Sequence, residues 1–349
     1  MSYAEGPYFL LQTRDSLFAD VGRTRAFTCT GTIKPMQLPA MAAWAWIPIV
    51  IAAALAQTIR NAAQRSLTAE VGTLPATLVR FLYGLPFAAA WLLVVVKFSA
   101  PGSAAMVLGA SYWAWLTLGA VTQILATALL LLAMKERNFV IGVALAKTEV
   151  LQVALLATVL LLEVPGFWAM VAMLCATAGV VLLTMPQKNV QSTTQAFWSL
   201  KAWQGKAALA GLASGACFAL ASVGYRGAAL TQPGASPWLI GAMGVLLAQF
   251  LQSLLLGGWI AVRDPGKLMQ IARAWRISTV AGAMGAMASI GWFTAFAMRP
   301  AADVKTLGLI EVIFSYLVSR KLFDEKLSGK ERLGLLLVSV GLVVVCAQL

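Results

Sequence analysis

The sequence predicts an all-α integral membrane protein with about ten transmembrane helices in two inverted five-helix repeats. Of its 349 residues, 60% are hydrophobic and only 11% are charged. Soluble domains are roughly 45–50% apolar and about 25% charged, so this chain has too few polar groups to cover a soluble fold. The apolar runs are continuous rather than alternating, which favours helices over barrel strands. A pattern of glutamates also recurs at a fixed spacing in the two halves of the chain.

Composition excludes several other classes of protein. The net charge of +13 arises from basic residues that lie mostly between the apolar runs, where they orient a protein in the bilayer. We therefore expect no nucleic-acid partner. The chain has no histidine, its four cysteines form no CxxC, and no GxxxxGK[ST] nucleotide-binding motif is present. These absences argue against a zinc site, a disulfide framework and transport driven directly by ATP, so we expect no cofactor and no enzymatic activity.

The first 40 residues differ from the rest of the chain. Residues 1–40 are mixed and polar, and they lack the order of regions that marks a cleavable signal. This tail is interpreted either as a disordered extension or as an artefact of start-site choice. Met36 or Met41 would each place the start directly before the first apolar run.

A spanning helix needs about 20 mainly apolar residues. Ten segments meet this condition approximately: 41–58, 75–96, 112–134, 139–161, 166–185, 206–224, 237–261, 277–297, 301–320 and 332–348. In the second segment, Gly84 and Pro86 lie near the middle and predict a kink.

The two halves are related by a constant offset. A polar linker, 186–205, separates a first repeat, 41–185, from a second, 206–349. Four landmarks recur 162 residues apart: Glu149/Glu311, Val150/Val312, Glu163/Glu325 and Gly179/Gly341. Five spans per repeat is an odd number, so the second repeat must enter the membrane from the opposite side. Inverted repeats of this kind are typical of secondary transporters.

These residues resemble the drug/metabolite transporter superfamily in its ten-helix, EamA-like branch. The family has paired five-helix repeats, an Arg-Phe early in the second helix, matched by Arg80-Phe81, and intramembrane glutamates matched by Glu149 and Glu311. A Gly-Glu commonly ends the fourth and ninth helices. Here the glutamates are present, but Leu162 and Asp324 stand where glycine is common. The resemblance implies a metabolite carrier, often an exporter, and names no substrate.

Two glutamates are the principal candidates for function. Glu149 and Glu311 each lie inside an apolar segment, where a charge costs roughly 2.5–3.5 kcal/mol. Each is therefore expected to face the bundle interior, to find a partner, or to take up a proton that it could exchange. The alternative is a hydrogen-bonded glutamate that only fixes helix packing. Lys147, two residues from Glu149, points to nearly the opposite face and is expected to meet another helix, a substrate carboxylate or the interface.

Further candidates follow from polar and aromatic residues within the apolar segments. Arg80 is expected to hold an acidic group or to be an interfacial arginine with a buried stem. The pocket candidates beside the glutamates are Gln152, Tyr83, Trp292 and Tyr316. Glu163 and Glu325 end their predicted helices and are interpreted as helix-end or gate residues.

Together these features predict a secondary carrier that works by alternating access. The expected cargo is a small polar or amphipathic metabolite such as an amino acid, moved out of or into the cell, with proton exchange at a glutamate. Expected partners are that substrate, membrane lipid and protons, and the expected location is a bacterial cytoplasmic membrane. The alternatives are a non-transporting assembly or sensor subunit and, less favoured, a membrane-embedded enzyme.

Charge also bears on orientation. Sixteen basic residues, including Arg60, follow the odd-numbered segments, and three, including Arg226, lie on the other face outside the tail. Positive charge in short loops marks the cytoplasmic side, so the count places both termini outside the cytoplasm. The family resemblance implies the reverse.

Overall fold

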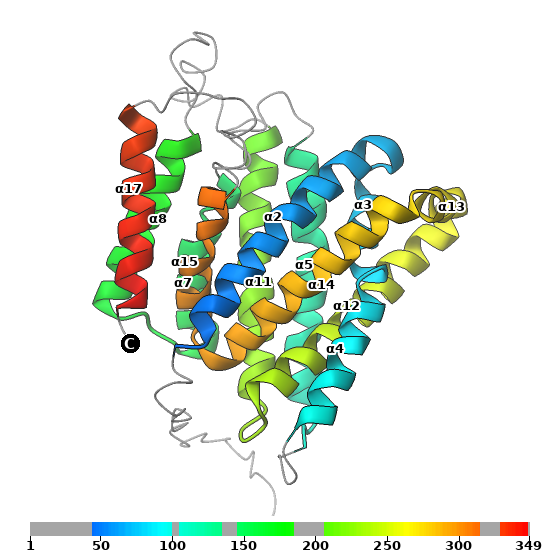
Figure 1. Ribbon diagram of the computed structural model, residues 1–349, viewed down its shortest axis with the longest axis horizontal. Helices are drawn as coiled ribbons and strands as arrows, with labels where there is room; N and C mark the ends of the chain where they lie inside the picture. The colour runs from blue at the N-terminus through cyan, green and yellow to red at the C-terminus, as the bar shows by residue number, and fades with distance from the viewer. Residues whose placement is uncertain (1–43, 100–104, 135–144, 185–205, 315–328, 348–349) are drawn as a thin grey trace, which may run out of the picture. The chain divides into compact units, whose positions relative to one another are not determined.

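The computed structural model describes residues 44–99, 105–134, 145–184, 206–314 and 329–347. The tail, 1–40, and the linker, 186–205, lie outside the described residues, so the predictions for both stay predictions. Every regular element within the described ranges is a helix, which confirms the all-α fold (Figure 1).

In the described part of the chain, six helical spans are long and apolar enough to cross a membrane, and a kinked pair of helices together forms one of them. They are α2 (Trp46–Val71), the kinked pair α3 and α4 (Thr73–Leu82 and Leu85–Phe98), α5 (Ala110–Ala133), α11 (Lys206–Leu230), α12 (Pro237–Arg263) and α14 (Trp275–Met298). This confirms a multi-pass membrane protein.

Shorter helices complete the described fold. They are α7 (Glu149–Leu161), α8 (Phe167–Thr184), α13 (Pro265–Arg273), α15 (Ala301–Gly308) and α17 (Gly329–Cys346). Of these, α7, α8 and α17 are also apolar. The count of ten spans and the inverted symmetry stay predictions at this point.

Glycine, proline and serine set several helix boundaries. Gly72, at φ 96°, separates α2 from α3 in a conformation that only glycine adopts without strain. The predicted kink is present, because α3 ends before Gly84 and α4 begins at Leu85 with Pro86 in its first turn. α12 starts after Ser236, whose hydroxyl oxygen accepts a hydrogen bond from the Leu239 amide at 3.2 Å.

Large apolar side chains on the outer faces fit a lipid environment. Leu93, Leu155 and Val343 are each about two-thirds exposed although they belong to helices. Such an outer surface is compatible with lipid and would be unfavourable in water.

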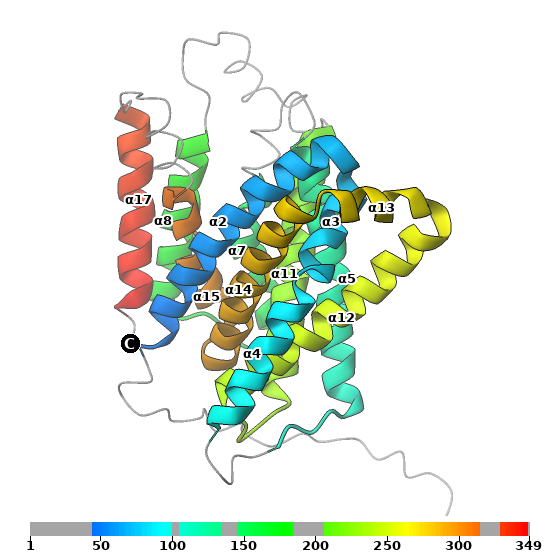
Figure 2. The ribbon, with the colours of Figure 1, turned by 45° about the vertical axis from the view of Figure 1, so that its right-hand side comes forward.

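Close helix pairs join the first half of the chain to the second. α2 lies along α14, α5 along α11, and α8 along α17 (Figures 1 and 2). Glycines permit these approaches: a Cβ built on Gly291 would lie 2.7 Å from Ala53 Cβ, and one on Gly224 would lie 2.8 Å from the Gly119 nitrogen. Small residues at helix contacts are typical of membrane bundles, where van der Waals packing drives association.

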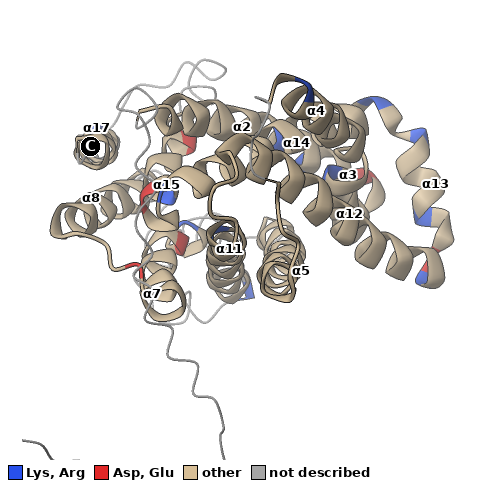
Figure 3. Cartoon of the chain, turned by 90° about the horizontal axis from the view of Figure 1, so that it is seen from below, with Lys and Arg blue, Asp and Glu red and all other residues tan. Residues whose placement is uncertain are grey.

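Several predicted boundaries are wrong. α2 continues to Val71 instead of ending at residue 58, and α11 continues to Leu230 instead of ending at 224. As a result Arg60 and Arg226, predicted in connections, lie within helices. The connection after α12 also contains α13, which carries basic residues along its length (Figure 3).

The segments that hold the two candidate glutamates are interrupted beside them, whereas continuous helices were predicted. Helical residues at 145–146 give way to a turn at Lys147 and Thr148 before α7 begins at Glu149. In the second half, α15 ends at Gly308, Leu309 forms a turn, and helix resumes from residue 310. Leu309 is the counterpart of Lys147 at the offset of 162, so the two breaks occur at equivalent places.

Candidate functional site

An open pocket lies among the helices, with about 660 Å³ of empty space when its mouth is included. The charged residues lining it are Arg60, Arg80, Lys147, Glu149 and Lys305. Its polar and aromatic lining includes Gln57, Asn61, Gln123, Ser222, Tyr225, Ser289, Phe218, Trp292, Phe293 and Phe296.

One ion pair in the site joins Lys305 of α15 to Glu149, the first residue of α7. The distance from Lys305 Nζ to Glu149 Oε1 is 3.0 Å, and the side chains are only 10% and 15% exposed. The Lys305 ammonium also lies 5.0 Å from the centre of the Trp292 ring and 5.8 Å from that of Phe218. Aromatic faces attract a cation at such distances, so carboxylate and rings together hold this lysine.

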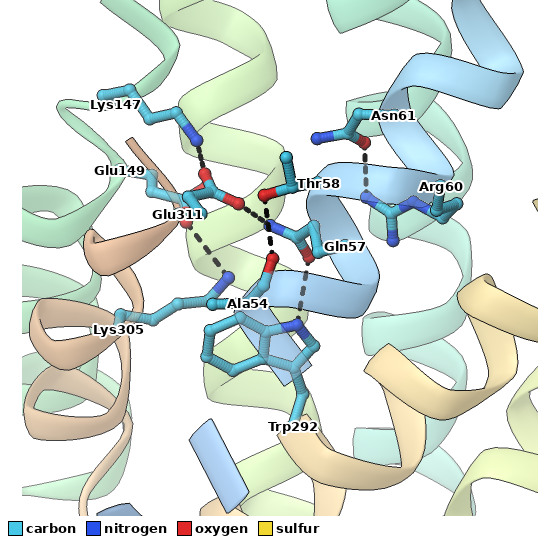
Figure 4. Close-up of polar contacts among 10 residues, drawn as sticks. All are labelled: Ala54, Gln57, Thr58, Arg60, Asn61, Lys147, Glu149, Trp292, Lys305 and Glu311. Atoms are coloured by element: carbon cyan, nitrogen blue, oxygen red, sulfur yellow. Dashed lines mark hydrogen bonds and ion pairs between the residues drawn. The ribbon is translucent and has the colours of Figure 1, made fainter. Parts of the chain in front are cut away.

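A second ion pair joins Lys147 to Glu311. Glu311 also accepts a hydrogen bond from Gln57 Nε2, and Gln57 Oε1 in turn accepts one from Trp292 Nε1 at 3.0 Å (Figure 4). Glu311 is buried, so its charge is balanced by the lysine and the amide rather than by water. Of the three alternatives for Lys147, the structure shows the contact with another helix.

The two ion pairs are crossed between the halves of the chain. Lys147 from the first half pairs with Glu311 from the second, and Lys305 from the second pairs with Glu149 from the first. Acidic and basic positions accordingly meet where α7 and α15 approach each other (Figure 3). Any movement of one half relative to the other at this point would alter both pairs.

Two arginines complete the charged lining. Arg60 of α2 and Arg80 of α3 are both buried, each with 3% of its surface exposed. Arg80 Nη1 donates to Thr127 Oγ1 at 2.9 Å, and Arg60 Nη2 donates to Asn61 Oδ1 at 2.7 Å. The burial of Arg80 excludes the alternative of an interfacial arginine whose charged end reaches water.

A network of neutral polar groups fixes one wall of the pocket. The Tyr225 hydroxyl donates to Gln123 Oε1 at 2.7 Å, and Gln252 Nε2 donates to the same oxygen at 2.7 Å. These contacts tie α11 and α12 to α5. Hydrogen bonds of this kind between membrane helices are worth on the order of 1 kcal/mol each, which suits a structural role.

Some predicted pocket residues lie elsewhere. The Tyr83 hydroxyl donates to the Ile271 carbonyl at 3.4 Å, beside α13 and away from the pocket lining. Gln152 Nε2 donates to Thr148 Oγ1 at 3.0 Å, which supports the helix break rather than the pocket wall. Tyr83 was predicted from its position within the segment, and Gln152 from its place on the helical face of Glu149, which the break before α7 changes. Trp292 does line the pocket, whereas Tyr316 and Glu325 fall outside the described residues.

Glu163 forms an ion pair at the far end of α7. Its Oε1 accepts hydrogen bonds from Arg226 Nε at 2.9 Å and Nη2 at 2.7 Å, while Arg226 Nη1 donates to the Phe296 carbonyl at 2.6 Å. Since Phe296 and Tyr225, next to Arg226, both line the pocket, this cluster lies at the pocket's margin. The contacts fit the predicted helix-end position, and the gate role stays a prediction.

Three residues of this site were not predicted from the sequence. Lys305 is a cation inside an apolar segment, the same signal that singled out Glu311, and it could have been found. Gln57 is a neutral amide in an apolar run, and its residue type alone does not distinguish a pocket residue from a structural one. Arg60 was assigned to a connection, although Gln57, Arg60 and Gln64 recur at helical spacing and already suggest a polar face. Among the described residues, no group of three acidic or cysteine side chains could hold a metal ion.

Comparison of the sequence with protein families and with curated proteins finds no match. Solved structures do match. One crystal structure of another protein superposes with a TM-score of 0.60, covering 87% of this chain and 96% of the other, at 17% sequence identity. At that identity the likeness shows a shared fold alone.

Proposed function

We propose that this protein is a secondary active transporter that moves a small metabolite across the membrane by alternating access. The observation behind the proposal is the crossed pair of salt bridges in an open pocket, Lys147–Glu311 and Lys305–Glu149. Ionisable groups at membrane depth are expensive and are usually found on substrate or ion pathways. Here four of them join the two halves of the chain, and three of the four, Lys147, Glu149 and Lys305, line the pocket.

The helix contacts support the inverted repeat on which such a mechanism depends. If the ten predicted segments are numbered in order, α2 and α14 are one and eight, and α5 and α11 are three and six. Exchanging the halves converts the α2–α14 contact into the α11–α5 contact. The same exchange converts the contact of α15 with α2 into that of α7 with α11, and both are present. This agreement supports two five-helix repeats related by a twofold axis in the membrane plane.

The interrupted helices support a substrate-binding site beside the two glutamates. Discontinuous helices in equivalent places of two repeats are typical of the substrate site of secondary transporters, near the bilayer midplane. The turn at Lys147–Thr148 and the turn at Leu309 each lie within two residues of a candidate glutamate. Each break therefore places a charged side chain of the site beside a turn, where it is not held within a continuous helix.

We propose further that the chain is an EamA-like carrier of a bacterial cytoplasmic membrane. The motifs around Arg80, Glu149 and Glu311 support this, and all three residues belong to the site or its ion pairs. Proton coupling would act through a glutamate that releases its lysine when it is protonated. The rival of a non-transporting subunit predicts a packed, dry centre, whereas a pocket with charged residues in its lining supports the carrier.

The test uses purified protein reconstituted into liposomes and a panel of radiolabelled metabolites, with and without an imposed pH gradient. We expect at least one metabolite to accumulate. In Glu149→Gln or Glu311→Gln, transport or its response to the pH gradient should be lost while the protein still folds. Glu70→Gln is the matched control, because Glu70 is exposed near the end of α2 and does not line the pocket.

The outcomes separate the possibilities. If both pocket variants transport like the unaltered protein at every pH tested, the glutamates are structural and coupling through them is wrong. If the full panel is neither accumulated nor exchanged across the liposome membrane, the carrier proposal fails in favour of a non-transporting subunit.

A further inference from the structure

Arg60 and Arg80 line the pocket without a carboxylate partner. In the described part of the chain, the ion pairs employ Lys147, Lys305 and Arg226, and neither pocket arginine takes part in one. Their hydrogen bonds go to neutral oxygens of Asn61 and Thr127. The Nε of Arg60 is buried and has no hydrogen-bond partner at all. A guanidinium group stays charged in a protein, so these are two buried and uncompensated positive charges.

The charge balance of the site is therefore positive. Four cationic side chains line the pocket, and the two carboxylates beside them are engaged by the lysines. A buried charge without a partner is strongly destabilising, typically by several kcal/mol. Two such charges facing one cavity indicate a site that becomes electrostatically complete only when an anion occupies it.

The stems of the two arginines pack against the same residue of α14, and both arginines line the pocket. Gly285 of α14 faces both: a Cβ built there would lie 3.4 Å from Arg60 Cδ and 3.4 Å from Arg80 Cβ. One turn later, Ser289 lines the pocket with a hydroxyl group. Because α14 places no side chain at 285, the two arginine stems can approach each other from α2 and α3.

Five aromatic side chains also line the pocket. Phe218, Trp292, Phe293 and Phe296 line it together with Tyr225. Such a wall favours a ligand with an apolar or aromatic body over a bare inorganic ion. A free amino group, by contrast, would reach Glu149 or Glu311 only by displacing a lysine.

We propose that Arg60 and Arg80 form the binding subsite for an anionic group of the transported molecule, so that the substrate is a small organic anion with a carboxylate or a phosphate ester. This proposal rests on the proposed carrier function and narrows it. The predicted zwitterionic amino acid is then disfavoured. Arginine suits the role, because its planar group binds carboxylate and phosphate through paired hydrogen bonds.

The test measures binding rather than transport, with purified full-length protein in detergent. The probes are phenylacetate and phenyl phosphate, which are aromatic anions, with phenylacetamide and phenethylamine as their neutral and cationic analogues. A ligand that binds the folded state raises the melting temperature in a concentration-dependent way. We expect one or both anions to raise it at millimolar concentrations, and the amide and amine to leave it unchanged. Comparison of the two anions distinguishes a carboxylate subsite from a phosphate subsite.

Variants assign the effect to the arginines. In Arg60→Gln and Arg80→Gln, anion affinity should fall by about 10- to 100-fold, the loss expected for a charge-assisted hydrogen-bonded contact. Arg276→Gln is the matched control, because Arg276 is exposed at the start of α14 and should leave anion binding unchanged. Without any ligand, the two pocket variants should melt no lower than the unaltered protein, because each removes an unpaired buried charge.

Several results would overturn the proposal. They are a response to neither anion, equal stabilisation by phenylacetamide, or a lower ligand-free melting temperature in the arginine variants with an unchanged anion response. The carrier function and this subsite can fail separately. Anion binding without transport would contradict the carrier alone, whereas transport of a neutral metabolite that is insensitive to both arginine variants would contradict the subsite alone.

Discussion

The Lys305–Glu149 pair offers a quantitative test of how strongly the two halves are coupled. At 3.0 Å, two unit charges attract by about 5–6 kcal/mol at an effective dielectric constant of ~20. Desolvation of both groups offsets much of this, so the net value of the pair is smaller. Removing one partner leaves the other buried and unpaired, which typically costs about 3–5 kcal/mol. We therefore expect Glu149→Gln and Lys305→Met each to lower the free energy of unfolding by about that amount.

The double variant distinguishes a true pair from two independent residues. When Glu149→Gln is combined with Lys305→Met, no buried charge is left unpaired, so the total loss should be well below the sum of the two single losses. We expect an interaction energy of at least about 2 kcal/mol, at the upper end of values for residues in direct contact. The assay is chemical unfolding in detergent micelles, with the free energy extrapolated to zero denaturant.

An exposed lysine provides the control for this cycle. Lys267 of α13 bonds only to Gln270 Oε1 at 3.1 Å on an exposed surface, so Lys267→Met should change stability by less than about 0.5 kcal/mol. Strictly additive losses in the Glu149–Lys305 cycle would refute the reasoning, because they would mean that neither charge feels the other.

Two further predictions concern the end of α7 and the orientation of the chain. Leu162 has a φ of 57°, a left-handed conformation that costs roughly 1 kcal/mol for a residue with a Cβ. Leu162→Gly should therefore not lower the melting temperature. The same change at Leu161, the last residue of α7, should lower it. Arg60 and Arg226 lie within helices, and leaving them out of the loop charges keeps the strong bias in place. A reporter that is active only outside the cytoplasm should therefore be active when it is fused after Leu349. A fluorescent, cytoplasmic carboxy terminus would contradict the second prediction.

Hydropathy predicted most of the described helices well. The segment predicted at 237–261 is α12 at Pro237–Arg263, and the one at 112–134 is α5 at Ala110–Ala133. In both cases the apolar run has sharp polar, glycine or proline boundaries. The kink at Gly84 was also predictable, because proline cannot donate a backbone hydrogen bond inside a helix.

The polar end of α2 shows where this method fails. Around Arg60 the chain contains arginine, asparagine and glutamine in quick succession, and a hydropathy average interprets such a stretch as a connection. In the structure Arg60 and Gln64 are buried, because they turn inwards on one helical face. Average hydropathy discards this periodicity, which is the property that separates a pocket-lining helix from a loop.

The composition of the site was only partly predictable, for a geometric reason. The offset of 162 identifies Glu149 and Glu311 as equivalent residues, but their lysine partners do not obey it. The position equivalent to Lys305 is Val143, and the one equivalent to Lys147 is Leu309. The ion pairs are made through space between halves, so no comparison along the chain could have matched each glutamate with its lysine.

The glycine contacts between α5 and α11, and between α2 and α14, bear on how the chain acquires its structure. Each of these close contacts takes one helix from each sequence half: Gly119 packs against Tyr225, and Ala53 against Gly291. A fragment holding only residues 41–185 would leave both surfaces of its own helices bare to lipid. The predicted repeats would then be units of sequence but not of folding, because the helices of the first half can complete their packing only after the second half has been synthesised.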